Sequence, residues 1–337
     1  MAASVPLAEP PSYEDVRAAR ERLAGFITPT PVLPWTRLGE RLDCRILLKC
    51  EQFQPTGAFK IRGATNALLG LSEEERRRGV VTHSSGNHGA ALAYAGRRLG
   101  VSVTVALPEG SSPAKIRLLE EEGARIVPCA PTQEAREATL ARLVATEGLM
   151  AIPPYDDRRV IAGQGTACDE FLDQAPDLDT LLVPVGGGGL IAGSALVLRA
   201  RRPEARLLGV EPAGAADTRE SLMTGNRLTR HQPETIADGL RALVGVLPFA
   251  IIRRAVDDVL TVTDEETISA LRLFVRETHA VIEPSSATVV AALLALPEAE
   301  RRGRTIGLLL SGGNVEPRAL AGWLAREEEP RADQRLR

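Results

Sequence analysis

The stretch TLLVPVGGGGLIAGSALVLR, residues 180–199, is the most informative segment for predicting how this chain folds. Residues 180–185 are an apolar, strand-like run and residues 190–199 have a helical composition, so four glycines form the turn between a strand and a helix. Glycines let backbone N–H groups approach an anion closely, and the dipole of the following helix favours negative charge there. The turn therefore predicts a phosphate site at Gly186, Gly187, Gly188 and Gly189, with an ordinary packing turn as the alternative.

Similar strand-like runs alternate with longer helical patterns along most of the chain. They lie at residues 45–49, 79–82, 102–107, 125–128, 206–210 and 305–310. Repeated strand–helix–strand units predict an α/β fold, with parallel sheets that carry helices on both faces. In such folds ligands bind at the carboxyl ends of the strands, where loops meet the first turns of helices.

The turn signals divide the chain into two domains. Residues 72–155 form compact strand–helix units and predict a small domain, inserted into a large domain made of residues 1–71 and 156–325. Residues 326–337 are a mixed-charge string with little apolar content, which indicates a disordered tail.

Composition excludes several classes of function. The 337 residues carry a net charge of −3, which leaves no broad basic face for nucleic acid or an acidic membrane. Neither the four scattered cysteines nor the four histidines have metal-ligand spacing, and we expect buried thiols in a reducing compartment. The first residues do not resemble a secretory signal, and no apolar run reaches the roughly 20 residues that span a bilayer. We expect a cytoplasmic protein.

The glycine stretch also matches a dinucleotide-binding fingerprint. Gly187, Gly189 and Ala192 fit G-x-G-x-x-A, and Glu211 follows about twenty residues later, where a ribose-binding acid would stand. This match alone would indicate a nicotinamide-dependent oxidoreductase. Two further motifs favour different chemistry.

The first is TGAFKIRGA, residues 56–64, which places Lys60 among small and apolar residues. A desolvated lysine loses its proton more easily and can form a Schiff base, although a lysine in an apolar segment can also simply reach solvent. The second motif is HSSGNHG, residues 83–89, between a predicted strand and a predicted helix. Its hydroxyls, amide and free N–H groups suit a carboxylate, beyond what helix capping requires.

Taken together, in their order along the chain, these three motifs resemble the fold-type II family of pyridoxal-phosphate enzymes. Within it the chain is most similar to the branch of serine racemases and catabolic-type threonine/serine dehydratases, from about residue 28 to residue 323. Further matching segments are IAGQGT (161–166), ETIADG (234–239), IEP (282–284) and SGGN (311–314). The resemblance implies two three-layer, parallel-sheet domains of the tryptophan synthase β type, with pyridoxal 5'-phosphate as the cofactor.

The resemblance also implies roles for individual residues. Lys60 would hold the cofactor as a Schiff base and, once freed, take the substrate's Cα proton. The other cofactor-binding residues would be Phe59 and Gly239 beside the ring, Asn87 at its phenolic oxygen, Ser311 at its nitrogen, and Gly186, Gly187, Gly188 and Gly189 at the phosphate. A neutral serine at the ring nitrogen makes the ring a milder electron sink, which suits β-elimination better than transamination.

Substrate contacts are implied in the same way. Ser84, Ser85, Asn87 and His88 would bind the substrate carboxylate. Ser85 would also be a second catalytic acid–base group on the opposite face from Lys60, as racemisation requires, but some hydroxyaspartate dehydratases share it. Arg136 lies where those relatives place an arginine near the substrate, with an exposed helix arginine as the alternative.

A cation site and a partner follow from the resemblance too. Glu211, the carbonyl of Ala215, and Asp217 match a divalent-cation site of the serine racemase branch, where oxygen ligands suit Mg²⁺, Ca²⁺ or Mn²⁺. Acidic residues before a helix can instead be caps. The resemblance implies a homodimer. His279 stands where many relatives have a lysine linked to nucleotide binding, so nucleotide activation is not expected.

We therefore predict a hydroxy-amino-acid ammonia-lyase, with threonine and serine as leading substrates. It would release a 2-oxo acid and ammonia after β-elimination of water. Serine racemase and 3-hydroxyaspartate dehydratase are the alternatives within the family, and a nicotinamide-dependent oxidoreductase is the remote one.

Overall fold

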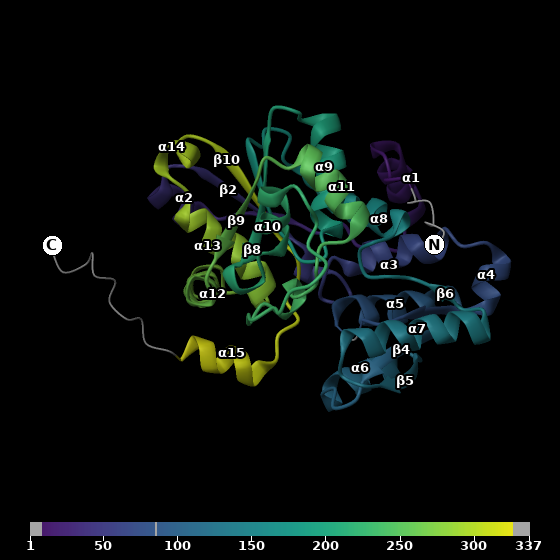
Figure 1. The fold of residues 1–337 in the computed structure, drawn as a ribbon. Coiled ribbons are helices and arrows are strands. Elements are labelled where there is room, and N and C mark those ends of the chain that lie inside the picture. Colours follow the sequence, from purple (N-terminus) through teal and green to yellow (C-terminus); the bar gives the residue numbers. More distant parts are fainter. Residues whose placement is uncertain (1–8, 85, 326–337) are drawn as a thin grey trace.

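The computed structural model describes residues 9–84 and 86–325, and within them the strands form two sheets (Figure 1). The larger is six-stranded, and five of its strands run parallel while β1 pairs antiparallel with β2. Its strands, in spatial order, are β1 (Val32–Pro34), β2 (Arg45–Cys50), β10 (Thr305–Leu310), β7 (Thr180–Pro184), β8 (Arg206–Pro212) and β9 (Asp258–Val262).

The smaller, four-stranded sheet is entirely parallel and is built from one continuous stretch of chain. Its strands, in spatial order, are β5 (Arg125–Cys129), β4 (Val103–Pro108), β3 (Val80–Thr82) and β6 (Met150–Ala151). In Figure 1 this sheet and its helices lie at the lower right, beside the body of the molecule.

Helices cover both sheets. Those of the small-sheet region are α4 (Glu73–Arg78), α5 (Asn87–Leu99), α6 (Pro113–Glu121) and α7 (Gln133–Glu147). The remaining helices are α1 (Tyr13–Leu23), α2 (Thr36–Leu42), α3 (Lys60–Leu69), α8 (Arg158–Gln174), α9 (Gly189–Arg201), α10 (Asp217–Thr224), α11 (Val246–Ala255), α12 (Asp264–Thr278), α13 (Pro284–Ala295), α14 (Glu298–Arg301) and α15 (Pro317–Leu324). No helix among the described residues is long and apolar enough to cross a membrane.

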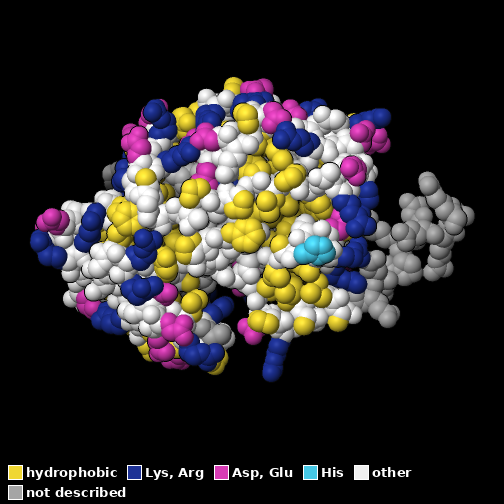
Figure 2. Space-filling model, turned by 180° about the vertical axis from the view of Figure 1, so that it is seen from behind, with side chains coloured by type: hydrophobic (Ala, Val, Ile, Leu, Met, Phe, Trp, Pro, Cys, Tyr) yellow, Lys and Arg dark blue, Asp and Glu magenta, His cyan; other side chains and the backbone are white. Residues whose placement is uncertain are grey.

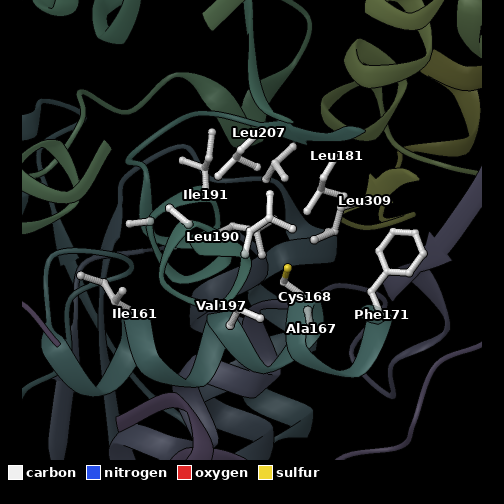
Figure 3. Close-up of a cluster of buried hydrophobic side chains, with 14 of the residues drawn as sticks. Ile161, Ala167, Cys168, Phe171, Leu181, Leu190, Ile191, Val197, Leu207 and Leu309 are labelled. Atoms are coloured by element: carbon white, nitrogen blue, oxygen red, sulfur yellow. The ribbon is translucent and has the colours of Figure 1, made fainter. Parts of the chain in front are cut away.

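Alternate residues of β7 explain the layering of the large sheet. Leu181 belongs to the apolar core that α8, α9 and α11 close on one face, whereas Leu182 belongs to the core that α12 and α13 close on the other. Figure 3 shows the first core, where Cys168 and Phe171 of α8 lie against Leu181 and Leu309 of the sheet. All of β7 is buried, because helices cover both faces of the sheet, and its sequence TLLVP is therefore almost entirely apolar.

The sequence predictions for strands are largely confirmed, including the α/β class and the parallel sheets. All seven predicted strands are present, with ends shifted by up to two residues. Strands β1, β6 and β9 were not predicted. The first two have only three and two residues, and β9 is an edge strand in which exposed and buried residues are mixed. The predicted tail at residues 326–337 and the predicted catalytic Ser85 lie outside the described residues.

Candidate active site

Lys60 is the first residue of α3, directly after the buried Phe59. Its amine donates to the carbonyl oxygen of Pro154 at 2.9 Å and lies 5.0 Å from the centre of the Phe59 ring. Burial disfavours the charged amine and lowers the pKa of Lys60 to about 8, although the carboxyl of Glu283 opposes this shift. At pH 7 roughly a tenth of an amine with this pKa is neutral and nucleophilic, far more than for an ordinary lysine.

The four glycines follow β7 after Val185, and the last of them, Gly189, is the first residue of α9. Gly188 has a φ of +84°, and a Cβ on Gly187 would lie 2.1 Å from the Tyr155 ring, so the turn is also tightly packed. Both interpretations of the glycines are thus compatible with the structure. The first N–H groups of α9 have no acceptor within their own helix, and they can bind a phosphate.

Contacts link the predicted cofactor residues into one ring. Lys60 reaches Pro154, and the neighbouring Tyr155 packs on the glycine turn. On the other side of the turn, a Cβ on Gly186 would lie 3.0 Å from the carbonyl oxygen of Gly239. Gly239 donates to the Ser285 hydroxyl at 3.1 Å, and the next residue, Ser286, lies 3.1 Å from the Ser311 hydroxyl. The contacts close where the Phe59 N–H donates to the Ser311 carbonyl at 2.9 Å. The structure therefore brings together the lysine, the turn, Gly239 and Ser311 from distant parts of the sequence.

Ser311 follows β10 and is buried. Its hydroxyl lies 3.1 Å from the hydroxyl of Ser286, which also donates to the carbonyl of Gly312. Among its contacts the structure shows hydroxyl groups and no carboxylate partner within the described residues. A ring nitrogen placed beside Ser311 would thus meet a neutral hydrogen-bonding group.

Asn87 begins α5 and connects the two sheet regions. Its amide nitrogen donates to both carboxyl oxygens of Glu283, at 3.2 and 3.0 Å, and its amide oxygen accepts from Asn314 at 3.0 Å. Glu283 is only 3% exposed, and burial raises the pKa of its carboxyl to about 7. Glu283 and Asn314 lie in segments that match the family, but neither residue was predicted to have a role. The available signal was an acid directly before the proline that starts a helix.

Residues 83–89, the loop predicted to bind the substrate carboxylate and called the carboxylate loop below, do not all point toward the site. His88 is 1% exposed, its Nε2 lies 3.1 Å from the carbonyl oxygen of Ile152, and burial lowers its pKa to about 3. Its neutral imidazole is thus turned into the protein, and its backbone N–H in the first turn of α5 is the group left for a substrate carboxylate. Ser84 precedes this helix and is partly exposed.

Arg136 lies in the first turns of α7, where its Nε donates to the Thr132 carbonyl at 3.4 Å. Its side chain is half-buried. After burial, the charge of Arg136 is the second cause that lowers the pKa of His83, at the start of the carboxylate loop. A cation therefore acts on the loop where a substrate would bind.

The predicted cation ligands lie together at the end of β8. The two carboxyl oxygens of Glu211 accept from the N–H groups of Thr218 and Arg219, each at 2.9 Å, so this carboxyl caps α10. Asp217 accepts from Val244 with Oδ2, while its buried Oδ1 makes no hydrogen bond with the described residues, and His231 Nδ1 is 3.6 Å away. Ala215 ends the short turn η2 (Ala213–Ala215). The free Oδ1 fits a cation, whereas the described residues hold no cluster of three or more acidic, histidine or cysteine ligands.

Comparisons with known proteins identify relatives over most of the chain. A family model described as "Pyridoxal-phosphate dependent enzyme" matches residues 23–312. Serine racemase of Dictyostelium discoideum is 41% identical over 308 residues, or 90% of this chain and 95% of the relative. L-threo-3-hydroxyaspartate ammonia-lyase of Saccharomyces cerevisiae is 40% identical over 320 residues, 95% of this chain and 98% of the relative. The solved structure of a threonine deaminase from T.th. has a TM-score of 0.85 and 42% identity, and covers 91% of this chain and 99% of that chain.

Proposed function

The chain belongs to the family of pyridoxal-phosphate dependent enzymes, and on that premise we propose that it is a hydroxy-amino-acid ammonia-lyase acting on threonine or serine. The observation that carries the proposal is the position of the Lys60 amine, which donates to the carbonyl of Pro154, next to the Tyr155 ring that packs on the glycine turn. Similar proteins are named as serine racemase, L-threo-3-hydroxyaspartate ammonia-lyase and threonine deaminase, and these names are consistent with a hydroxy-amino acid as substrate.

The chain's own residues supply positioning and proton transfer. Pyridoxal phosphate, when bound, supplies the electron sink that makes the Cα–H bond acidic. Lys60 would hold the cofactor, with Phe59 and Gly239 beside its ring and Asn87 at its phenolic oxygen, and would then accept the Cα proton. The glycine turn would bind the phosphate. Neutral Ser311 does not hold a proton on the ring nitrogen, which favours loss of the β-hydroxyl over transamination.

A dicarboxylic substrate is the second candidate. Arg136 acts electrostatically on the carboxylate loop, and a second carboxylate on the substrate would pair with its guanidinium. Relatives from Saccharomyces cerevisiae and Paracoccus denitrificans are named as hydroxyaspartate ammonia-lyase and dehydratase. Serine racemisation is the third, and it depends on Ser85 as the acid–base group opposite Lys60.

We also propose a divalent cation, Mg²⁺ first, at Asp217, Glu211 and the carbonyl of Ala215. Oδ1 of Asp217, which is buried and accepts no hydrogen bond from the described residues, supports this site. A homodimer and a cytoplasmic location remain part of the proposal. Hydrophobic side chains gather over the middle of one face of the molecule, as Figure 2 shows, and this face would contact the second copy. Sedimentation at several concentrations would show whether the mass in solution is twice that of the chain.

A substrate panel tests the proposed function. The purified protein, with pyridoxal phosphate, is given each isomer of serine, threonine and 3-hydroxyaspartate, and both oxo acid and the opposite enantiomer are measured. We expect oxo acid from L-threonine and L-serine, a lower rate after chelation, and recovery with Mg²⁺. Ser85→Ala should abolish any interconversion of L- and D-serine and largely spare elimination. A protein that stays colourless with pyridoxal phosphate and gives no borohydride-fixed adduct on Lys60 would refute the proposal.

A further inference from the structure

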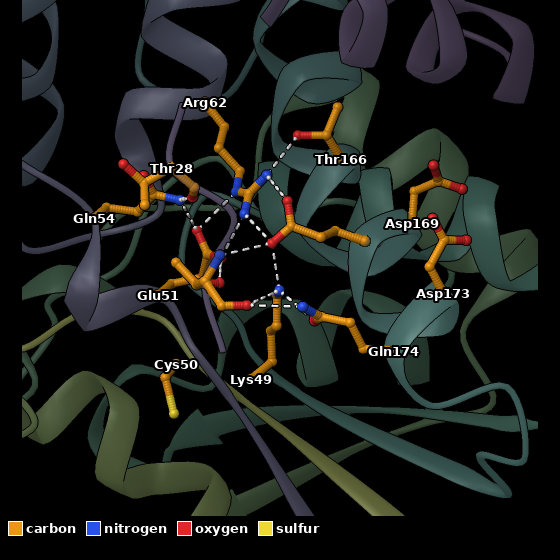
Figure 4. Close-up of polar contacts among 12 residues, drawn as sticks. Thr28, Lys49, Cys50, Glu51, Gln54, Arg62, Thr166, Asp169, Asp173 and Gln174 are labelled. Carbon is orange, nitrogen blue, oxygen red and sulfur yellow. Dashed lines mark hydrogen bonds and ion pairs between the residues drawn. The ribbon is translucent and has the colours of Figure 1, made fainter. Parts of the chain in front are cut away.

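A buried ionic network surrounds Arg62, two residues after Lys60 in the sequence (Figure 4). Its charged members are Arg62 of α3, Lys49 and Glu51 at the end of β2, and Glu170 of α8. The side chains of Arg62, Lys49 and Glu51 are 2%, 0% and 0% exposed. Two cations and two carboxylates balance in charge, so the network needs no external ion.

Arg62 is the centre of this network because all three of its nitrogens donate. Its Nε and one terminal nitrogen each donate to Glu51 at 2.8 Å. The terminal nitrogens also donate to the two carboxyl oxygens of Glu170, at 3.2 and 3.1 Å, and one of them to the Thr166 hydroxyl at 3.4 Å. A planar guanidinium held by two carboxylates has one allowed orientation, which a lysine ammonium would not impose.

Lys49 occupies the far side of the same network. Its amine donates to Glu170, to the carbonyl of Thr30 at 2.8 Å and to the Gln174 amide oxygen at 2.8 Å. These contacts join β2, α8 and the segment before β1. None of these three hydrogen bonds reaches α3 directly; Lys49 is connected to α3 through Glu170, whose Oε1 also accepts from Arg62.

The positions of Lys60 and Arg62 on α3 give the network a consequence for the site. Residues two apart on an α-helix are related by a rotation of about 200° around the helix axis, so their side chains point to nearly opposite sides. Arg62 therefore pulls the first turn of α3 toward β2 and α8, while Lys60 points to the opposite side, toward Pro154. Any rotation of this turn that moves the Lys60 amine must break hydrogen bonds of Arg62 inside the protein.

We propose that Arg62 is a positioning residue for Lys60: held between Glu51 and Glu170, it fixes the rotation of the first turn of α3 and so delivers the lysine amine to the cofactor site. The inference rests on the proposed role of Lys60. It gives a functional reason for a buried ionic cluster, since a well-packed apolar cluster of similar volume would hold the fold equally well.

The test compares Arg62→Lys with Lys49→Arg in the full-length protein. Each variant keeps the net charge and changes the geometry of one buried cation of the network. The fraction of Lys60 that carries the cofactor after borohydride reduction is measured by mass spectrometry against the concentration of free pyridoxal phosphate. We expect Arg62→Lys to raise the half-saturating concentration about tenfold or more, because a misplaced reacting group loses effective concentration. The half-saturating concentration for Lys49→Arg should stay near that of the wild type, although the melting temperatures of Lys49→Arg and Arg62→Lys should be similar.

Two outcomes would overturn the inference. One is unchanged attachment to Lys60 in Arg62→Lys, and the other is an equal loss in Lys49→Arg, which would make the network a matter of stability alone. If Arg62→Lys does not fold, Glu51→Gln replaces it in the test. This change keeps the size of the side chain and weakens its hydrogen bonds with Arg62, so the half-saturating concentration should again rise. Absence of attachment in the wild type would instead refute the proposed function.

Discussion

At the scale of single residues, the group that sequence reasoning left without a role is the carboxyl of Glu283. It is buried beside Lys60, and its two carboxyl oxygens accept hydrogen bonds from the amide of Asn87. Its raised pKa means that the folded protein binds its proton more tightly than the unfolded chain does. The unfavourable contribution of this carboxyl to folding therefore grows as the pH rises from about 4.5 to about 7 and is constant above that.

Glu283→Gln should remove this dependence. Relative to the wild type, the free energy of unfolding of the variant should improve by about 1–3 kcal/mol between about pH 5 and pH 8, because each pKa unit corresponds to about 1.4 kcal/mol. Thermal unfolding across this range measures the difference. Glu265→Gln, in the exposed first turn of α12, is the matched control. A constant difference between Glu283→Gln and the wild type at every pH would contradict the argument.

At the scale of elements, the glycine turn combines tight packing with free helix N–H groups. The Tyr155 ring occupies the space that a side chain at position 187 would need. Gly187→Ala should therefore lower the free energy of unfolding by about 1–3 kcal/mol and weaken the binding of pyridoxal phosphate and of free inorganic phosphate. Calorimetric titration with both ligands checks this.

Gly322→Ala is the control for that experiment. Gly322 lies in α15 with no described atom near enough to meet an added Cβ, so alanine there should leave binding unchanged and stabilise the helix slightly. Wild-type phosphate affinity in Gly187→Ala would indicate that the turn is a packing feature only.

The elements also show how far the sequence leads. Long apolar strands such as β7, and the glycine turn after it, could be predicted because burial on both faces leaves a plain apolar pattern. The convergence of Lys60, the turn and Ser311 followed from resemblance to a family. The orientation of His88 could not be predicted, since it depends on the Ile152 carbonyl, 64 residues away. Nor could the pairing of Arg62 with Glu170, because nothing local in the sequence relates residues 108 apart.

In the molecule as a whole, Asn87 links the small-sheet region to the large one near the site: it donates to Glu283 at 3.2 and 3.0 Å and accepts from Asn314 at 3.0 Å. Asn314 is held on the large-sheet side, where it donates to the Thr56 carbonyl at 2.8 Å. We propose that residues 72–155 move as a small domain against residues 1–71 and 156–325, with these links favouring the closed arrangement.

Asn314→Ala should loosen this contact without reaching the core. We expect faster hydrogen exchange of backbone amides at the start of α5, and a larger change in KM than in kcat, because closure binds substrate before chemistry occurs. Hydrogen exchange measured by mass spectrometry gives separate rates for the start of α5 and for the large-sheet region. Asn226→Ala, at an exposed asparagine, is the control and should leave the rates at α5 unchanged. Unchanged exchange at α5 would refute the proposed link.

The position of β10 has a consequence for how the protein forms in the cell. This strand lies between β2 and β7 at the centre of the large sheet, yet of the described strands it is the last to leave the ribosome. The small sheet, made of neighbouring segments, can assemble while synthesis continues, since contacts close in sequence form early. The large sheet must keep a gap of one strand until residues 305–310 arrive, and Ser311 comes directly behind them. The newborn chain therefore acquires its ability to capture a cofactor only after this strand has been translated.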